Sequence, residues 1–264
     1  MHLPFTPPLH PDNLFGHLVA TAVPGVEEWR DGAYRRTVRL VDRSAIVSVS
    51  FGRDHLGMEG PAEAVEAVRF LFDLDADPAV IDAALSADPV LAPLVAAAPG
   101  RRVPRTVDPA EMALRAVLGQ QVSTAAAATH TARLVRDAGE PIDDPDGGLT
   151  HLFPTPAAVA AVDPESLALP RARRATLLGL ARALEDGLDL SDREALLALP
   201  GIGPWTVETI RMRALGDTDA FPATDLGLRA TLPGLDPERW RPYRAYAVQH
   251  LWALGDHAIN RMPA

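Results

Sequence analysis

The sequence predicts a mostly helical protein with an α+β domain at its N-terminus, and three observations lead to this prediction. Within residues 36–51 two extended runs flank a turn, and Val47, Val49 and Phe51 of the second run alternate with serines, as expected of a half-buried strand. A proline-rich stretch follows at residues 89–104. Beyond it, the signals that start and end elements are almost all those of helices.

The first part of the chain is predicted to form a hairpin followed by a helix. The turn lies at residues 42–44, and the stretch from Pro61 to Leu74 has apolar residues at helical spacing. Because prolines and glycines interrupt the stretch after it, we place a domain boundary there. The predicted domains are an N-terminal α+β domain, residues 1–90, and a helical domain, residues 91–264.

The helical domain can be divided by its capping residues. A side-chain oxygen before a helix accepts the first free N–H groups, and a glycine after it adopts conformations that other residues resist. The first expected helix follows the N-cap Asp108, with Pro109 in its first turn and Glu111 as its capping-box residue, and an alanine-rich helix extends from Ser123 to Gly139. A third helix covers 171–186 and ends at Gly187, and Ser191 and Glu194 form a further capping box. The last two expected helices cover 204–215, ending at Gly216, and 242–254, ending at Gly255.

Composition excludes several classes of site. The chain of 264 residues has no cysteine, which excludes disulfides, iron–sulfur clusters and cysteine nucleophiles. All 25 basic residues are arginines, so only the α-amino group of Met1 remains to form a Schiff base with a sugar aldehyde. No apolar run approaches the roughly 18 residues of a membrane span, and the first residues lack the basic and apolar regions of a signal peptide. We therefore expect a cytoplasmic protein without a membrane partner.

The formal net charge of −10 is unusual for a protein that binds nucleic acid, because contacts with phosphates normally require a basic surface. The charge is unevenly distributed, however. Residues 54–94 hold nine acids against one arginine, whereas residues 101–136 hold six arginines against two acids and residues 165–182 hold four against one. Ordinary solvated helix faces give the same clusters, so the pattern permits DNA binding without requiring it.

The most informative segment is the glycine turn at residues 200–203. It joins a short helix to a new helix that begins at Pro204, so two helices are connected by a tight hairpin. Glycines there can expose backbone N–H groups at a helix N-terminus to an anion such as a DNA phosphate. A dinucleotide-binding turn is excluded, because Thr206 stands where the third glycine is needed. A purely structural corner between helices is the alternative.

Two motifs carry a resemblance to a known family. Leu-Pro-Gly-Ile-Gly-Pro-Trp-Thr at residues 199–206 is followed, about twenty residues after its second glycine, by Asp225 in Phe-Pro-Ala-Thr-Asp. This arrangement resembles the helix–hairpin–helix (HhH-GPD) DNA glycosylases, and within them the AlkA type, 3-methyladenine DNA glycosylase II. The resemblance extends over nearly the whole chain, including the N-terminal α+β domain. Supporting segments lie at residues 115–123, 153–156, 169–174, 240–246 and 250–252.

The resemblance implies a two-part helical glycosylase body and assigns roles to particular residues. Asp225 is the implied catalytic carboxylate. The implied base pocket consists of Trp205, Trp252, Thr209 and Leu226; the implied DNA contacts are Gly201, Ile202, Gly203, Thr206, Gln121, Arg171, Arg173 and Arg174; and the backbone carbonyls of Leu197, Leu199 and Ile202 are implied to hold a monovalent cation, with no side-chain metal ligand.

Four positions depart from the family pattern. Trp205 stands where lyases of the superfamily carry a nucleophilic lysine, which agrees with the absence of lysine and predicts a reaction that stops at the abasic site. Thr209 and Leu226 replace pocket tyrosines, so bases are expected to stack less strongly. Gln121 stands where a leucine enters the DNA gap, so it is expected to fill that gap through polar contacts.

The chemistry implied for Asp225 is physically consistent. A base in a duplex must be flipped out before it is cut, and damaged or weakly paired bases are flipped at least cost. A purine alkylated at N3 or N7 is cationic and leaves readily, so the enzyme has mainly to stabilise an oxocarbenium-like sugar with an opposing charge. Asp225 also precedes a helical run at 226–231 as an ordinary N-cap would, and Trp205 and Trp252 also suit a protein core.

We therefore predict a monofunctional glycosylase that excises alkylated purines from double-stranded DNA in base excision repair. It is expected to lack lyase activity, to need no cofactor, to be a monomer and to act in the bacterial cytoplasm at the nucleoid. The alternative is a non-catalytic helix–hairpin–helix DNA-binding protein. Asp225 at the expected distance from the hairpin favours the enzyme.

Overall fold

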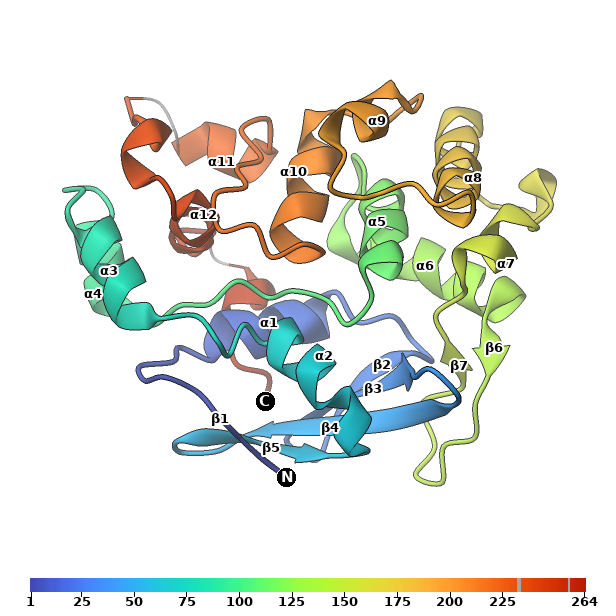
Figure 1. The fold of residues 1–264 in the computed structure, drawn as a ribbon, viewed down its shortest axis with the longest axis horizontal. Coiled ribbons are helices and arrows are strands. Elements are labelled where there is room, and N and C mark those ends of the chain that lie inside the picture. The colour runs from blue at the N-terminus through green and yellow to red at the C-terminus, as the bar shows by residue number, and fades with distance from the viewer. Residues whose placement is uncertain (232–233, 256) are drawn as a thin grey trace.

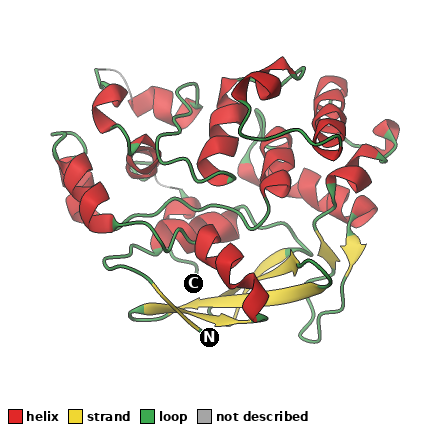
Figure 2. Cartoon of the chain, viewed as in Figure 1, coloured by secondary structure: helices red, strands yellow, loops and turns green. Residues whose placement is uncertain are grey.

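The computed structural model describes residues 1–231, 234–255 and 257–264. Helices form a broad layer over a small antiparallel sheet, and α1 (Asp12–Ala20) lies between the two (Figure 1). The strands gather at one side of the molecule and the helices occupy the rest (Figure 2). The predicted fold class is confirmed. None of the described helices is long and apolar enough to cross a membrane.

The sheet contains the predicted hairpin together with strands that the sequence analysis did not identify. Its order is β1-β5-β4-β3-β2, with every neighbouring pair antiparallel. Val47 and Val49 are buried and Ser50 is exposed, as the alternation predicts. The buried face packs against α1 and α2 in one apolar core. The strands are β1 (His2–Pro4), β2 (Glu27–Arg30), β3 (Ala33–Arg39), β4 (Ser44–Phe51) and β5 (His55–Glu59).

The helices begin near most of the predicted caps. Asp108 accepts from the backbone N–H groups of Ala110 and Glu111, and Ser123 accepts from that of Ala126. The helices are α2 (Val65–Leu71) after η1 (Ala62–Ala64), α3 (Pro78–Ser86), α4 (Ala92–Ala97), α5 (Pro109–Leu118), α6 (Thr124–Ala138), α7 (Pro156–Ala160), η2 (Pro164–Ser166), α8 (Arg171–Glu185), α9 (Arg193–Ala198), α10 (Pro204–Arg213), α11 (Leu226–Thr231), η3 (Pro237–Trp240), α12 (Arg244–Trp252) and η4 (Ala258–Asn260).

Three local predictions are wrong. Glu111 does not close a capping box, because its carboxylate is buried against Arg36 and Arg115 instead. Ser191 does not cap α9; Asp192 does, and accepts from the N–H of Ala195 at 2.9 Å. The part of the chain predicted to be all helical also contains a two-stranded ladder of β6 (Glu140–Pro141) and β7 (His151–Leu152). These strands are two residues long, too short to leave an alternating pattern.

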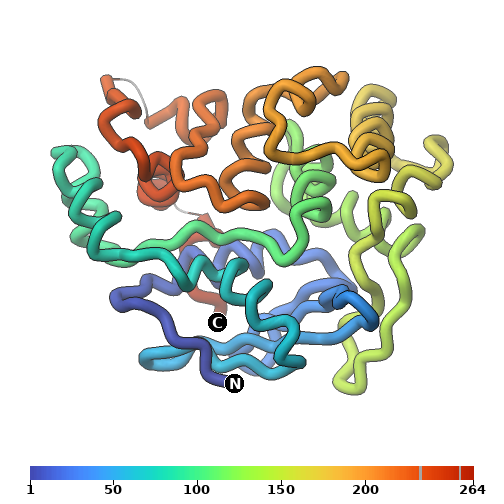
Figure 3. The backbone as a smooth tube through the Cα atoms, viewed as in Figure 1, coloured from blue at the N-terminus to red at the C-terminus, as the bar shows by residue number. Residues whose placement is uncertain are grey.

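The buried apolar side chains of the described residues form three cores. One lies between the sheet and the helices α1 and α2, one lies among α5, α6, α8 and α10, and one joins α3 and α4 to α12. The segment at residues 98–108 crosses the middle of the molecule between the helices and the sheet (Figure 3). It is not an exposed linker, because Arg102 and Val103 are buried. The division of the chain into residues 1–90 and 91–264 stays a prediction.

Candidate active site

The predicted glycine hairpin lies between α9 and α10 and is anchored to α8. Gly201 has a φ of +83°, in the left-handed region that favours glycine. A Cβ at this position would also collide with the side chain of Thr176 on α8. Ile202 is buried in the core beneath the turn. The local sequence therefore fixes this turn with a glycine that a larger residue could replace only with backbone strain and a shift of Thr176, and with an apolar anchor directly after it.

Gly203, the second glycine, leaves the N-terminus of α10 open. It precedes the helix in an extended conformation, with φ −109° and ψ 175°, and no side chain caps the helix. Apart from its own neighbours along the chain, no described residue has an atom within 4 Å of the place where its Cβ would stand. The first N–H groups of α10 therefore combine free hydrogen-bonding capacity with the positive end of the helix dipole. Helix N-termini of this kind bind anions.

Gln120, which the sequence analysis did not single out, ties the loop after α5 to the hairpin. Its amide donates to the carbonyl oxygen of Gly201 and to the hydroxyl of Thr206, both at 3.0 Å. Its own backbone carbonyl accepts from the guanidinium of Arg173 at 2.6 Å. The neighbouring Gln121 is exposed and has a φ of +54°. One glutamine thus supports the hairpin from within, while the predicted gap-filling residue projects into solvent.

Asp225 lies where three helices converge. Its Oδ1 accepts from the backbone N–H groups of Gly227 at 3.0 Å and Leu228 at 3.2 Å, so it caps α11. The same oxygen accepts from the indole N–H of Trp252 on α12 at 3.0 Å. Oδ2 accepts from the indole N–H of Trp205 on α10, also at 3.0 Å. The carboxylate is therefore an N-cap and, at the same time, the shared partner of both predicted pocket tryptophans.

A cavity of about 340 Å³ opens beside this carboxylate. Trp205, Thr209, Asp225 and Trp252 all line it, so the structure brings four of the predicted site residues together. Its volume lies in the range of small-molecule pockets, roughly 300–1,000 Å³. Much of the remaining wall comes from small residues of α5, α6 and the loop between them, which leave the space open: Ala116, Gly119, Thr124, Ala127, Ala128 and Thr131.

Leu226 is the one predicted pocket residue that does not line the cavity. It begins α11, and its side chain is 80% exposed. The reason is local: Asp225 turns inward to cap the helix and to meet the indoles, and the next residue consequently points outward. Any contact of Leu226 with DNA would be made outside the cavity.

The three predicted DNA-contacting arginines of α8 have different surroundings. Arg173 is engaged by the backbone of Gln120. Arg174 donates to the carbonyl oxygen of Pro164 at 2.8 Å and pairs with Glu165 at 3.0 Å. Arg171 is exposed and has no hydrogen bond or ion pair with the residues that the structure describes. Arg171 is therefore wholly free to meet a phosphate, whereas Arg173 and Arg174 already use part of their guanidinium groups for internal contacts.

The predicted cation site also stays a prediction. The carbonyl of Leu199 accepts from the N–H of Ile202 at 3.0 Å, which closes the hairpin turn. A carbonyl oxygen that accepts one hydrogen bond keeps a second lone pair, and clustered carbonyl oxygens suit a hard cation. The three predicted carbonyls are therefore chemically suited to a monovalent cation. Among the described residues, no three His, Asp or Glu side chains are grouped to hold a metal ion.

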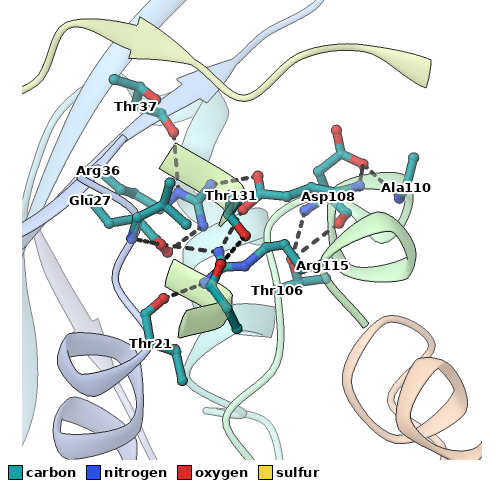
Figure 4. A network of polar contacts seen from close by, with 12 residues as sticks. Thr21, Glu27, Arg36, Thr37, Thr106, Asp108, Ala110, Arg115 and Thr131 are labelled. Carbon is teal, nitrogen blue, oxygen red and sulfur yellow. Dashed lines mark hydrogen bonds and ion pairs between the residues drawn. The ribbon is translucent and has the colours of Figure 1, made fainter. Parts of the chain in front are cut away.

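A buried ionic network forms another part of the cavity wall. Glu27 of β2 and Arg36 of β3 meet Glu111 and Arg115 of α5, with ion-pair distances of 2.8–3.4 Å (Figure 4). Tyr34 donates to Glu27 at 2.6 Å. Burial opposes ionisation of Glu27, but Arg115 and Arg36 outweigh it and lower the pKa of Glu27 below its usual value. The network joins the sheet to the helices at the site.

Arg213 is the second feature of the cavity that sequence reasoning missed. It ends α10, lines the cavity and is 7% exposed. Burial and the nearby Arg115 lower the pKa of Arg213 to about 10, while Asp225 acts in the opposite direction. The guanidinium is therefore protonated at neutral pH. Sequence spacing gives a partial signal, since Arg213 follows Trp205 and Thr209 on one face of α10 at intervals of four residues.

Comparisons with known proteins agree with this geometry. Residues 1–108 match the model of the AlkA N-terminal domain. A probable bifunctional transcriptional activator/DNA repair enzyme AlkA of Mycobacterium tuberculosis is 49% identical in an alignment that covers 100% of this chain and 58% of that protein. The chain therefore spans little more than half of this relative. DNA-3-methyladenine glycosylase 2 of Escherichia coli is 33% identical in an alignment that covers 95% of each chain.

Solved structures share the fold. A 3-methyladenine DNA glycosylase from Archaeoglobus fulgidus matches with a TM-score of 0.81 at 21% identity, over 96% of this chain and 97% of that one. An 8-oxoguanine glycosylase/lyase from Clostridium acetobutylicum matches with a TM-score of 0.76 at 18% identity, over 92% of this chain and 94% of that one. At these identities the likeness concerns the fold alone.

Proposed function

Because this chain belongs to the family of DNA-3-methyladenine glycosylase 2, the AlkA family, we propose that it excises alkylated purines from double-stranded DNA by hydrolysing the N-glycosidic bond. The observation that carries this proposal is the arrangement of Asp225, whose carboxylate receives four N–H donors at the edge of a small-molecule-sized cavity. The proposal concerns excision alone, as the chain spans 58% of the mycobacterial relative whose name also describes a transcriptional activator.

The four donors give Asp225 a fixed position before any substrate arrives. Two come from the first turn of α11 and two from the indoles of Trp205 and Trp252. A carboxylate that is already oriented needs no reorganisation when positive charge develops on the sugar, which is the condition for strong electrostatic catalysis. With a flipped purine in the cavity, its sugar would lie against Asp225, where the carboxylate opposes the charge and orients the attacking water.

The reaction is proposed to stop at the abasic site. The chain has no lysine, and Trp205 occupies the first turn after the hairpin, where its indole is bound to Asp225. Without a side-chain amine no Schiff base with the sugar can form there. One chain supplies the hairpin, the carboxylate and both indoles, so a monomer acting on cellular DNA in the cytoplasm suffices.

The direct test is to incubate the protein with DNA treated with a methylating agent and to identify the released bases by chromatography. We expect free 3-methyladenine and 7-methylguanine. The treated DNA should stay uncut until hot alkali is added, and borohydride should trap no covalent complex. Release of no base would refute the proposed function, whereas base release with strand cleavage would refute only the absence of lyase activity.

The hairpin is proposed to grip the DNA backbone, with a phosphate at the N-terminus of α10. Gly203 allows a test that leaves the fold intact, because its φ is negative and the space beside it is open. We expect Gly203→Ala to weaken binding to abasic-site DNA about tenfold, since the methyl group enters the space of the phosphate. Its unfolding free energy should fall by about 1 kcal/mol or less.

Fluorescence anisotropy and urea unfolding measure the two effects. The matched control is Gly179→Ala on α8, where the space is also open but the residue lies inside a helix away from the hairpin. Unchanged affinity in Gly203→Ala would mean that no phosphate approaches this position.

A further inference from the structure

The guanidinium of Arg213 is held in the cavity by contacts that leave most of its N–H groups unused. Its Nη1 donates to the carbonyl of Pro104 at 2.7 Å. Its carbon Cζ lies 5.7 Å from the ring centre of Trp252, within range of a cation–π contact. The described residues offer it no other hydrogen bond, although a guanidinium carries five N–H donors. The remaining donors are therefore available to a molecule in the cavity.

Arg213 is also the one cavity arginine that forms no ion pair with the described residues. Arg36 and Arg115 share Glu27 and Glu111, and the remaining cavity arginine pairs with a buried aspartate: Arg105 with Asp73, at 2.7 Å. No carboxylate of the described residues lies within 4 Å of the guanidinium of Arg213. His17, which lines the same cavity, adds no charge, because burial and then Arg213 and Arg115 hold its pKa well below the usual value.

An unpaired buried charge is costly, by several kcal/mol, and such groups concentrate at functional sites. Arg213 and Asp225 both contact Trp252, the arginine over the ring face and the aspartate at the indole N–H. One indole thus separates a negative group, beside the position of the sugar, from a positive group within the base cavity. This polarity matches the charge that develops when a neutral base leaves, since the sugar becomes positive and the base becomes negative.

We propose that Arg213 binds the flipped base and stabilises its departure, which makes it a specificity-determining residue that favours neutral purines. This inference rests on the proposed function. As the bond between C1′ and the base nitrogen breaks, its electron pair stays with the base. The free N–H groups of Arg213 donate to an acceptor on the purine edge and oppose that negative charge. Water then adds to C1′ and loses a proton, and the departing base takes up a proton from solvent.

Arg213 has the opposite effect on a cationic base. A purine alkylated at N3 or N7 carries positive charge in the ground state and leaves as a neutral molecule, so no negative charge needs support. Arg213 repels it in the cavity and gains nothing in the transition state. The residue should therefore widen the range of bases toward neutral lesions at the expense of cationic ones.

The test compares Arg213→Met with wild type in single-turnover excision of hypoxanthine and of 7-methylguanine from the same duplex. Methionine fills similar space without charge. We expect the rate on hypoxanthine to fall about 10²-fold more than the rate on 7-methylguanine, as the loss of one preorganised donor predicts. Arg213→Lys should recover part of the hypoxanthine rate, because it keeps the charge. The control is Arg211→Met on the same helix, whose arginine pairs with Glu208 and Asp217 outside the cavity lining.

Two results would overturn the proposal and leave Arg213 a packing residue. One is an equal loss of rate on both bases, and the other is a hypoxanthine rate for Arg213→Lys that is no higher than the rate for Arg213→Met. Melting temperature and affinity for abasic-site DNA reveal whether Arg213→Met fails to fold. If it does, the proposal is decided by the ratio of the hypoxanthine rate to the 7-methylguanine rate in Arg213→Lys. Failure of the proposed function gives a different result, since the wild-type protein would then release neither base.

Discussion

Asp225→Asn is expected to keep the fold and DNA binding but to lower the excision rate by about 10²–10³, or about 3–4 kcal/mol of transition-state stabilisation. Asparagine keeps the size of the side chain, and its Oδ1 can still accept from Gly227, Leu228 and Trp252. What it loses is the negative charge that opposes the developing charge on the sugar. It also places an amide NH₂ against the indole N–H of Trp205, where two donors meet.

Single-turnover excision measures the effect, and melting temperature together with affinity for abasic-site DNA tests the fold. Neutral lesions should show the larger defect, because their bases leave less readily and need more stabilisation of the sugar. Asp77→Asn is the matched control: Asp77 caps α3 through the N–H groups of Ala79 and Val80 but contacts no indole. Excision by Asp225→Asn within a few fold of wild type would mean that Asp225 is an N-cap and not the catalytic carboxylate.

The parts of this site that the sequence predicted depend on local signals. Gly201 has a positive φ and lies close to α8. Both features require a glycine, so a glycine in a predicted turn indicates them in the sequence. Asp225 stands before a helix, and Trp205 and Trp252 stand near the start and end of helices that can be recognised from the prolines before them and the glycines after them. The family resemblance implied only that the three belong to one site, and their hydrogen bonds were not predicted, because these depend on the way α10, α11 and α12 pack together.

The parts that were missed depend on contacts between distant segments. Arg213 matters because its guanidinium donates to the carbonyl of residue 104 and forms no ion pair with a described carboxylate, and the sequence near residue 213 indicates neither fact. Glu111 looked like a capping residue because its partner Arg36 is 75 residues away. Gln120 and Gln121 are identical in type and adjacent in sequence, so only the backbone geometry of the loop distinguishes the supporting residue from the exposed one.

The buried network explains how the sheet contributes to a site made mostly of helices. Glu27 and Arg36 belong to the sheet, and Arg115 belongs to the helix α5 that forms part of the cavity wall. Arg115 also donates to the carbonyl of Thr21 at 2.7 Å, which brings the end of α1 to the same place (Figure 4). Charges in such a network hold each other in one geometry, because every member would be unpaired in any other.

We therefore expect Glu27→Ala to lower the unfolding free energy by about 3–5 kcal/mol. The change leaves Arg36 and Arg115 to share the single carboxylate of Glu111, and it removes the acceptor of the Tyr34 hydroxyl and of the Val23 N–H. Urea unfolding at constant pH measures the loss. Glu63→Ala is the control, since Glu63 pairs with Arg43 at the surface, where both side chains are more than half exposed and solvent screens the pair, so its loss should change the unfolding free energy far less.

The pH dependence separates the charge of Glu27 from its packing. The pKa of Glu27 is lower in the folded protein than its ordinary value of 4.5, because Arg115 and Arg36 outweigh the effect of burial. Its contribution is therefore fully present above about pH 4.5 and is lost as the pH falls through the lower folded-state pKa. The difference in unfolding free energy between wild type and Glu27→Ala should shrink as the pH is lowered from about 6 to about 3. A difference that stays constant over this range would mean that Glu27 stabilises the fold by filling space and not by its charge.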